Sequence, residues 1–283
     1  MAKSTWKKLP GSKIELEVIL DREEFQSYWQ TAYDRALSQI HLKGFRPGTA
    51  PKELADQAVD KEKVFQEATT GSVHWSLDKI IQENNWTIID KPKIEVDEYK
   101  LGLKYKAILT IFPEIQLGNY KKIAKKFFSE KKEIKMEPAE VDKALEWLRQ
   151  SKKQGDKVSE LNDEFAKSLG KFQNVEELRK SVEEGLVLEK EYRERDRRRI
   201  QALDEIIKDT KMDIPDIMVE KTLDQIAGND KDLREKMKDQ ARKNVASNLI
   251  LYKIANVEKI ESDPESSLDN EKVFQYLESL AAK

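Results

Sequence analysis

The chain has 283 residues, of which 37% are charged and 38% hydrophobic, and its formal net charge is −2. A chain of this length can bury a core and form two domains, but so few apolar residues favour long, two-sided helices over one compact globule. The near-neutral charge argues against a general nucleic-acid binder, so any contact with a polyanion must be local. The absence of cysteine excludes disulfides, thiolate catalysis and cysteine-ligated metals.

The first part of the chain predicts an α+β domain that ends near Leu117. Residues 13–20 alternate between polar and apolar side chains, which is typical of a half-buried strand. Three later segments have a strand-like composition and are separated by turn residues: residues 86–90, 93–99 and 103–112. We therefore expect a four-strand antiparallel sheet with helices.

Two helices are predicted between the first and second of these strands. Asp21 caps the first helix, with Glu24 three residues later, and Gly44 is expected to end it. Pro51 opens the second helix, which should run to about residue 84 with a break near Gly71.

A tight, positively charged loop joins these two helices. It reads Gly44-Phe45-Arg46-Pro47-Gly48-Thr49-Ala50-Pro51, and its glycines and prolines constrain the backbone so that Phe45 and Arg46 stand side by side. From Arg35 to Lys52 the sequence has no acidic residue. Such a loop suits docking onto RNA or an acidic protein surface. With Phe45 packed inward it would be an ordinary helix connection, and the loop alone favours neither reading.

The stretch that follows the predicted sheet domain is rich in lysine. Seven lysines lie between Lys121 and Lys135, offset only by Glu130 and Glu133. We expect a solvated, extended linker strand here, and a second basic contact surface is the alternative.

The rest of the chain predicts an extended all-α region with long helices. Pro138 starts one helix, and Asn174 caps another of roughly 35 residues, on the order of 50 Å long, whose apolar stripe thins at residues 193–199. A polar middle between two apolar ends fits a helix that spans open space between packed regions. Further helices are expected at about 215–227, 230–259 and 270–281. The expected domains are residues 1–117, a linker (an extended segment and a helix) at 118–157, and a helical domain at 158–283.

Several short motifs together resemble one protein family. Gly-Phe-Arg-x-Gly-x-x-Pro at residues 44–51 resembles the ribosome-docking signature of the bacterial trigger factor family. Further motifs follow in the order in which they occur in that family. Residues 111–117 resemble the segment where its N-terminal domain joins the linker. Residues 161–166 and 174–179 resemble the entry to its helical C-terminal domain. Residues 213–219 resemble a turn inside that domain. The likeness runs from about residue 12 to about residue 260.

The resemblance implies an ATP-independent chaperone. It would hold nascent polypeptides beside the polypeptide exit of the large ribosomal subunit and assist their folding. Its ribosome-binding residues would be Gly44, Phe45, Arg46, Pro47 and Gly48. Phe45 would fill an apolar depression on a ribosomal protein, and Arg46 would pair with a carboxylate or an RNA phosphate. Thr49 stands where the family usually has lysine, which leaves Arg46 as the main charge.

Client binding is expected in the helical region, where scattered apolar side chains would hold unfolded segments weakly. Methionine side chains adapt to different partners, so Met212, Met218 and Met237 are the candidates. Plain core filling is the simpler role for any one of them. Whether the chain also forms a homodimer is left open.

Most members of that family carry a peptidyl-prolyl isomerase domain between the linker helix and the C-terminal domain. Here the linker helix should end near Lys153 and the matching C-terminal region starts at Leu161. The seven residues between them cannot hold a domain of even ~50 residues. We therefore expect neither the isomerase domain nor any other enzyme activity, and no cofactor, metal or small-molecule substrate.

The remaining features contain no catalytic pattern. The two histidines, His41 and His74, lack a nucleophile or metal-ligand spacing, and no phosphate-binding Gly-Lys-Ser/Thr loop occurs. The lysine-containing start has no apolar run behind it, and no window approaches the ~20 apolar residues of a membrane span. A cytoplasmic protein without membrane contact is therefore expected. The alternative reading is a helical interaction scaffold that binds one folded partner and does not associate with ribosomes.

Overall fold

The structure, a computed structural model, describes residues 3–43, 45, 51–97, 102–130, 135–152, 160–260 and 270–282. The chain forms two compact units, each built from two stretches of sequence. Unit 1 contains Met1–Gln116 and Met212–Ala246, and unit 2 contains Leu117–Lys211 and Ser247–Lys283. The division at residues 117 and 157 expected from the sequence stays a prediction.

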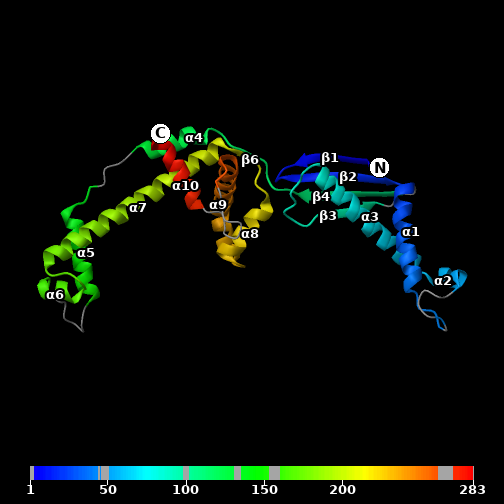
Figure 1. Cartoon of the computed structure of the whole chain (residues 1–283), viewed down its shortest axis with the longest axis horizontal. Helices are drawn as coiled ribbons and strands as arrows, with labels where there is room; N and C mark the ends of the chain where they lie inside the picture. Colours follow the sequence, from blue (N-terminus) through cyan, green and yellow to red (C-terminus); the bar gives the residue numbers. More distant parts are fainter. Residues whose placement is uncertain are drawn as a thin grey trace. The chain divides into compact units, whose positions relative to one another are not determined.

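Unit 1 contains the predicted sheet domain (Figure 1). Its elements are β1 (Lys3–Leu9), β2 (Lys13–Asp21), α1 (Arg22–Gln39), α2 (Lys52–Ala58), α3 (Lys61–Glu83), β3 (Lys93–Asp97), β4 (Gly102–Thr110), β5 (Ile115–Gln116) and α8 (Asp216–Ala227). Two elements contribute to both units, β6 (Lys211–Met212) and α9 (Lys231–Glu258). The main sheet has the order β1-β2-β4-β3 with antiparallel neighbours. This confirms the predicted fold class for the first part of the chain.

The core of unit 1 lies on one face of this sheet. Alternate residues of β2 and β4 are buried there, and α3 packs against them through Val73, Leu77 and Ile80. The hydroxyls of Ser76 and Tyr105 hydrogen-bond at 2.8 Å inside this core, and burial raises the pKa of Tyr105 to about 12. The strict alternation explains why β2 could be predicted from sequence.

One of the four predicted strands is wrong. Residues 86–90 form only an isolated bridge, Ile88 to Ile111, and β1 supplies the fourth strand instead. Asn85, the residue after the cap residue of α3, has a positive φ of 53°, and the rings of Trp86 and Trp6 then pack edge to face with their centroids 5.3 Å apart. β1 escaped prediction because it is a lysine-rich edge strand with almost no buried residue, so it lacks the apolar alternation of an inner strand.

The predicted ends of two helices also need correction. α1 ends at Gln39 rather than Gly44, and Ile40 already has extended backbone angles. The second predicted helix breaks at residues 59–60 rather than at Gly71, because the Asp60 carboxylate accepts hydrogen bonds from two amides of the new helix α3. Gly71 lies inside α3, next to Tyr28 of α1.

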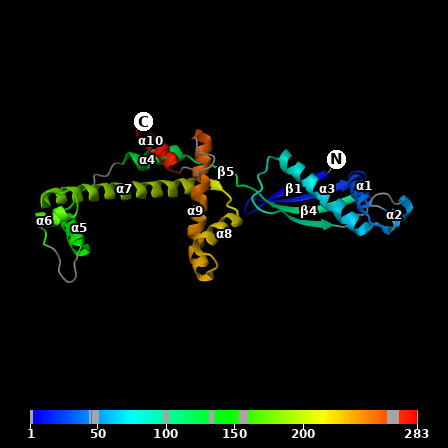
Figure 2. The same ribbon diagram turned by 60° about the horizontal axis from the view of Figure 1, so that its bottom comes forward.

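Unit 2 is helical, as predicted. It contains α4 (Tyr120–Ser129), α5 (Pro138–Ser151), α6 (Asp163–Ser168), α7 (Val175–Asp209), α10 (Asn270–Ser279) and a 3₁₀ turn (Leu280–Ala282). The Asn174 side chain caps α7, which has the predicted 35 residues. Figure 2 shows α5 and α6 at one end of α7, where Val141, Leu145, Phe165, Ala166 and Leu178 form a buried cluster.

The part of the lysine-rich stretch up to Ser129, expected to be extended, forms helix α4 instead, and residues 131–134 lie outside the described residues. Tyr120, Ala124 and Phe128 are buried at i, i+4 spacing against α7 and α10, and the Asn119 side chain caps the helix at its start. Apolar residues at every fourth position were masked in the sequence by the lysines between them.

A buried arginine of α7 forms ion pairs with two glutamates of α10. The guanidinium of Arg199 donates to both carboxylate oxygens of Glu271, at 2.7 and 2.9 Å, and to Glu278 at 2.6 Å. These hydrogen bonds, with those to Glu271 the strongest, raise the pKa of Arg199. Removing one carboxylate would leave a nearly buried cation underpaired.

Among the described helices, none is both long and apolar enough to cross a membrane.

Candidate docking loop and exposed apolar side chains

The predicted docking loop lies between α1 and α2. Of its candidate residues the structure describes Phe45, whereas Gly44, Arg46, Pro47 and Gly48 lie outside the described residues. The Phe45 amide donates to the Leu42 carbonyl at 3.0 Å, which closes a tight turn. The Phe45 side chain is 43% exposed. It is therefore available to a partner rather than packed inward as in an ordinary helix connection.

The helices on either side hold the two ends of this loop in place. The Tyr33 hydroxyl of α1 donates to the Asp56 carboxylate of α2 at 2.5 Å, and this bond raises the pKa of Tyr33. Ile40 and Val59, which flank the loop, both pack into one apolar cluster. A loop anchored in this way can present a side chain at low entropic cost.

The net positive charge of the window around the loop, from Arg35 to Lys52, is smaller than the sequence indicated. The Arg35 guanidinium of α1 pairs with the Glu67 carboxylate of α3 at 2.5 Å, so its charge is largely offset. His41 shares a hydrogen bond through Nδ1 with the Gln39 carbonyl, at 3.0 Å. Lys43 and Lys52 are exposed and still contribute to the window free of acidic residues.

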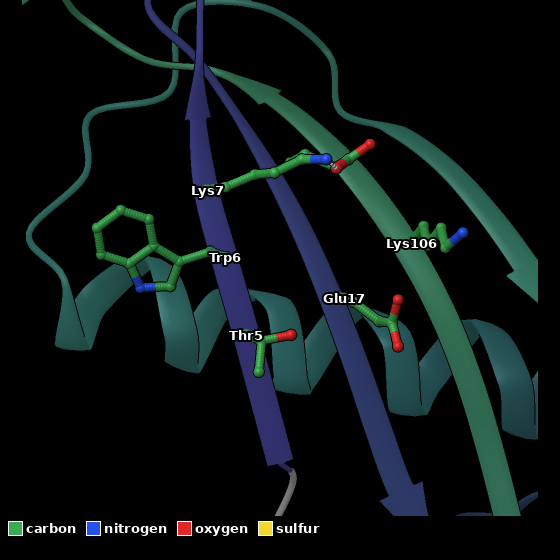
Figure 3. Close-up of a pocket in the computed structure, with 6 residues that line it drawn as sticks. Thr5, Trp6, Lys7, Glu17 and Lys106 are labelled. Carbon is green, nitrogen blue, oxygen red and sulfur yellow. Dashed lines mark ion pairs between the residues drawn. The ribbon is translucent and has the colours of Figure 1, made fainter.

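A shallow depression lies on the other face of the sheet of unit 1 (Figure 3). Its lining residues come from β1, β2 and β4: Thr5, Trp6, Lys7, Glu15, Glu17 and Lys106. Lys7 pairs with Glu15, and Lys104 pairs with Glu17 at 2.8 Å, which lowers the pKa of Glu17. Opposite charges that face each other across strands stabilise a solvated sheet face.

The three candidate methionines lie in the part of unit 1 that follows α7. Met212 is in β6, Met218 in α8 and Met237 in α9, and each side chain is half-buried. They are therefore less accessible than several other apolar side chains, and their role in client binding stays a prediction.

The most exposed apolar side chains of unit 2 were missed by the sequence reading. Trp147 of α5 is 69% exposed, and Leu188, Tyr192 and Ile200 of α7 are also more than half exposed. Leu188 and Tyr192 are four residues apart and so share one face of the helix. A signal was present in the sequence, because Trp147 lies off the stripe formed by Val141, Leu145 and Leu148.

Comparison with known proteins identifies the family. The family described as "Bacterial trigger factor protein (TF)" matches residues 2–148, just over half of the chain. The chain belongs to the bacterial trigger factor family. The description "Bacterial trigger factor protein (TF) C-terminus" matches residues 174–271. Trigger factors are chaperones, so the chain is a member of a chaperone family.

Trigger factors of two bacteria are similar over nearly the whole chain. The protein of Caldicellulosiruptor saccharolyticus is 23% identical over 369 residues, which cover 90% of this chain and 83% of the relative. That of Staphylococcus carnosus is 23% identical over 382 residues, which cover 95% and 86%. Both aligned spans exceed the 283 residues of this chain, so both relatives contain residues without a counterpart here.

A solved structure supports the same fold. It is described as "Promiscuous Substrate Recognition in Folding and Assembly Activities of the Trigger Factor Chaperone" and matches with a TM-score of 0.60 and 15% sequence identity, over 99% of both chains. At this identity the likeness concerns the fold alone.

Proposed function

We propose that this trigger factor family member is an ATP-independent, ribosome-associated chaperone that holds nascent polypeptides and has no prolyl isomerase activity. The observation that carries the proposal is the exposed Phe45, in a loop with the sequence Gly-Phe-Arg-x-Gly-x-x-Pro, inside the region that matches the family. An exposed aromatic on a braced turn suits an interface anchor.

In this proposal the loop docks on the large ribosomal subunit near the polypeptide exit. Phe45 enters an apolar depression on a ribosomal protein, and Arg46 pairs with a carboxylate or a phosphate. Gly44, Pro47 and Gly48 shape the backbone around them. Because Arg35 pairs with Glu67, fewer positive charges near the loop are free to contact the ribosome. We therefore expect the apolar contact of Phe45 to contribute more to ribosome binding than the charged contacts do.

The absence of isomerase activity is supported by the chain's spacing. The two family matches are separated by residues 149–173 alone, and α5 ends at Ser151 while α6 begins at Asp163. A domain of even ~50 residues cannot fit into this interval. The additional residues in the aligned relatives agree with a domain present there and absent here.

Client holding is proposed for exposed apolar side chains. Trp147, Leu188 and Tyr192 stand among charged neighbours on α5 and α7, which allows weak binding of unfolded segments without self-association. The half-buried Met212, Met218 and Met237 would add adaptable contacts.

Co-sedimentation with ribosomes tests the docking proposal. The double variant Phe45→Ala/Arg46→Ala should lose most ribosome binding while its circular dichroism stays unchanged. Phe65→Ala/Arg22→Ala is the matched control, because it removes the same residue types from exposed positions of α3 and α1, and it should bind as the wild type does. Binding by a well-folded loop variant at wild-type strength would overturn the docking site.

Suppression of aggregation tests client holding. The wild type should slow the aggregation of a denatured test protein without nucleotide. Trp147→Ser/Leu188→Ser/Tyr192→Ser should lose much of that effect. A control variant with three exposed charged residues of α7 replaced, Lys180→Ser/Glu184→Ser/Glu191→Ser, should retain it. If the wild type at several-fold excess leaves aggregation unchanged, the folded-partner scaffold becomes the better reading.

A further inference from the structure

Helix α4 has one face made of lysines. Lys122, Lys125 and Lys126 follow the i, i+3, i+4 spacing that places side chains together on a helix surface, and all three are exposed. No acidic residue occurs anywhere in Tyr120–Ser129. We call Lys122, Lys125 and Lys126 the α4 basic face.

The helix cannot turn these lysines toward an internal partner. Its opposite side is fixed by the burial of Tyr120, Ala124 and Phe128, so the basic face points to solvent. Among the described residues, none forms an ion pair with Lys122, Lys125 or Lys126, whereas neighbouring Lys121 pairs with Glu258 at 2.8 Å. The α4 basic face is thus a local excess of positive charge in a chain whose net charge is −2.

Local electrostatics make this arrangement costly for the free protein. Lys121 and Lys122 lie in the first turn of α4, where the helix dipole disfavours cations. At the other end the helix dipole favours cations, and there Lys126 lies in the last turn while Arg198 of α7 donates to the Glu130 carbonyl at 3.3 Å, so the cost at that end is the mutual repulsion of these positive charges. The Nε of Arg198 is buried without a hydrogen-bond partner in the described structure. Repelling charges held together on a rigid helix are relieved when they bind a polyanion.

We propose that the α4 basic face binds the phosphate backbone of RNA. Lysine is depleted in protein–protein interfaces, whereas lysines and arginines that contact phosphates position proteins on nucleic acids. Tyr120, Ala124 and Phe128 are buried, and the half-buried Phe127 lies beneath Lys126, whose Nζ is 5.6 Å from the centre of its ring, so the lysines are the groups most accessible to a ligand. The contact would be sequence-independent and sensitive to salt. The inference deepens the proposed ribosome association and rests on it, with ribosomal RNA as the ligand class.

The test measures binding of a fluorescent 20-nucleotide oligouridylate to the full chain by anisotropy at several salt concentrations. Lys122→Gln/Lys125→Gln/Lys126→Gln should bind about tenfold more weakly at low salt, and the salt slope should fall by about 2, since each lost phosphate contact removes roughly 0.7 from it. The control Lys231→Gln/Lys236→Gln/Lys238→Gln makes the same change in net charge on α9, among acidic neighbours, and should bind as the wild type does.

A second arm uses ribosome co-sedimentation to separate this inference from the proposed function. The lysine variant should bind ribosomes more weakly than the wild type does. The variant Phe45→Ala/Arg46→Ala should lose ribosome binding but keep its affinity for oligouridylate. If the wild-type protein does not co-sediment with ribosomes but binds oligouridylate through the α4 basic face, ribosome association is refuted and the phosphate contact is supported. Wild-type RNA affinity in the lysine variant would overturn the inference. So would polyglutamate competing as strongly as RNA, which would indicate an acidic protein partner.

Discussion

Glu258 connects three helices of unit 2, so a substitution at this residue tests how they pack together. It lies at the end of α9, and its carboxylate accepts hydrogen bonds from Lys121 Nζ at 2.8 Å and from the Tyr120 hydroxyl, both on α4. A third hydrogen bond comes from Tyr276 of α10. The side chain is 16% exposed, so water screens these bonds only in part. The variant Glu258→Gln keeps the shape of this side chain and removes its charge.

The size of the effect follows from the protonation equilibrium. Hydrogen bonds from Lys121, then Tyr120 and Tyr276, lower the pKa of Glu258 from 4.5 to about 2. Each pKa unit corresponds to about 1.4 kcal/mol, which sets an upper limit of about 3 kcal/mol, and partial exposure reduces this to about 1–2 kcal/mol. Because the folded-state pKa is depressed, this stabilisation is fully present above the ordinary glutamate pKa and is lost as the pH falls through about 2.

Urea unfolding of the wild type and Glu258→Gln at pH 7 and near pH 2.5 measures this difference. We expect the variant to be less stable by about 1–2 kcal/mol at pH 7, and we expect the gap to shrink strongly at the acidic pH. Hydrogen exchange at pH 7 should locate the loss in Tyr120–Ser129, with amide exchange about 5–30-fold faster. Glu184→Gln, at an exposed position of α7, is the control and should change neither quantity. A stability gap of equal size at both pH values would refute the reasoning.

Three further predictions concern packing and activity. Leu145→Ala should lower the free energy of unfolding by about 2–4 kcal/mol, because Leu145 is buried in the cluster between α5 and α7. Gly118→Ala should destabilise the start of α4, because its Cβ would collide with the Asp209 carboxylate that accepts the Asn119 amide at 2.7 Å. The purified chain should not accelerate cis-to-trans conversion of a proline tetrapeptide beyond the slow uncatalysed rate.

Each of these predictions has its own check. Urea unfolding measures Leu145→Ala against the control Leu188→Ala, whose side chain is more than half exposed and should matter little. Equal losses in both variants would contradict the cluster's role. Hydrogen exchange in α4 tests Gly118→Ala, and unchanged protection there would contradict the predicted collision. A clear isomerase rate in the purified chain would show that the spacing argument is wrong.

The sequence by itself determined features that depend on residues close together along the chain. Asn174 and the following run without proline predicted α7 at its observed length, because caps and helical periodicity act within about one turn. The alternation of residues 13–20 predicted β2 for the same reason. The motif at residues 44–51 indicated the family and placed Phe45 in a connecting loop.

Only the tertiary structure decided features that depend on distant residues. Arg35 belongs to the positive window in sequence, but Glu67, 32 residues away, offsets its charge. Residues 3–9 became a strand because β2 offered an edge, not because of any pattern of their own. The lysine-rich stretch up to Ser129 forms helix α4 because α7 and α10 cover Tyr120, Ala124 and Phe128. Burial and charge pairing are set by which segments fold together, and this fold-level information is absent from local sequence.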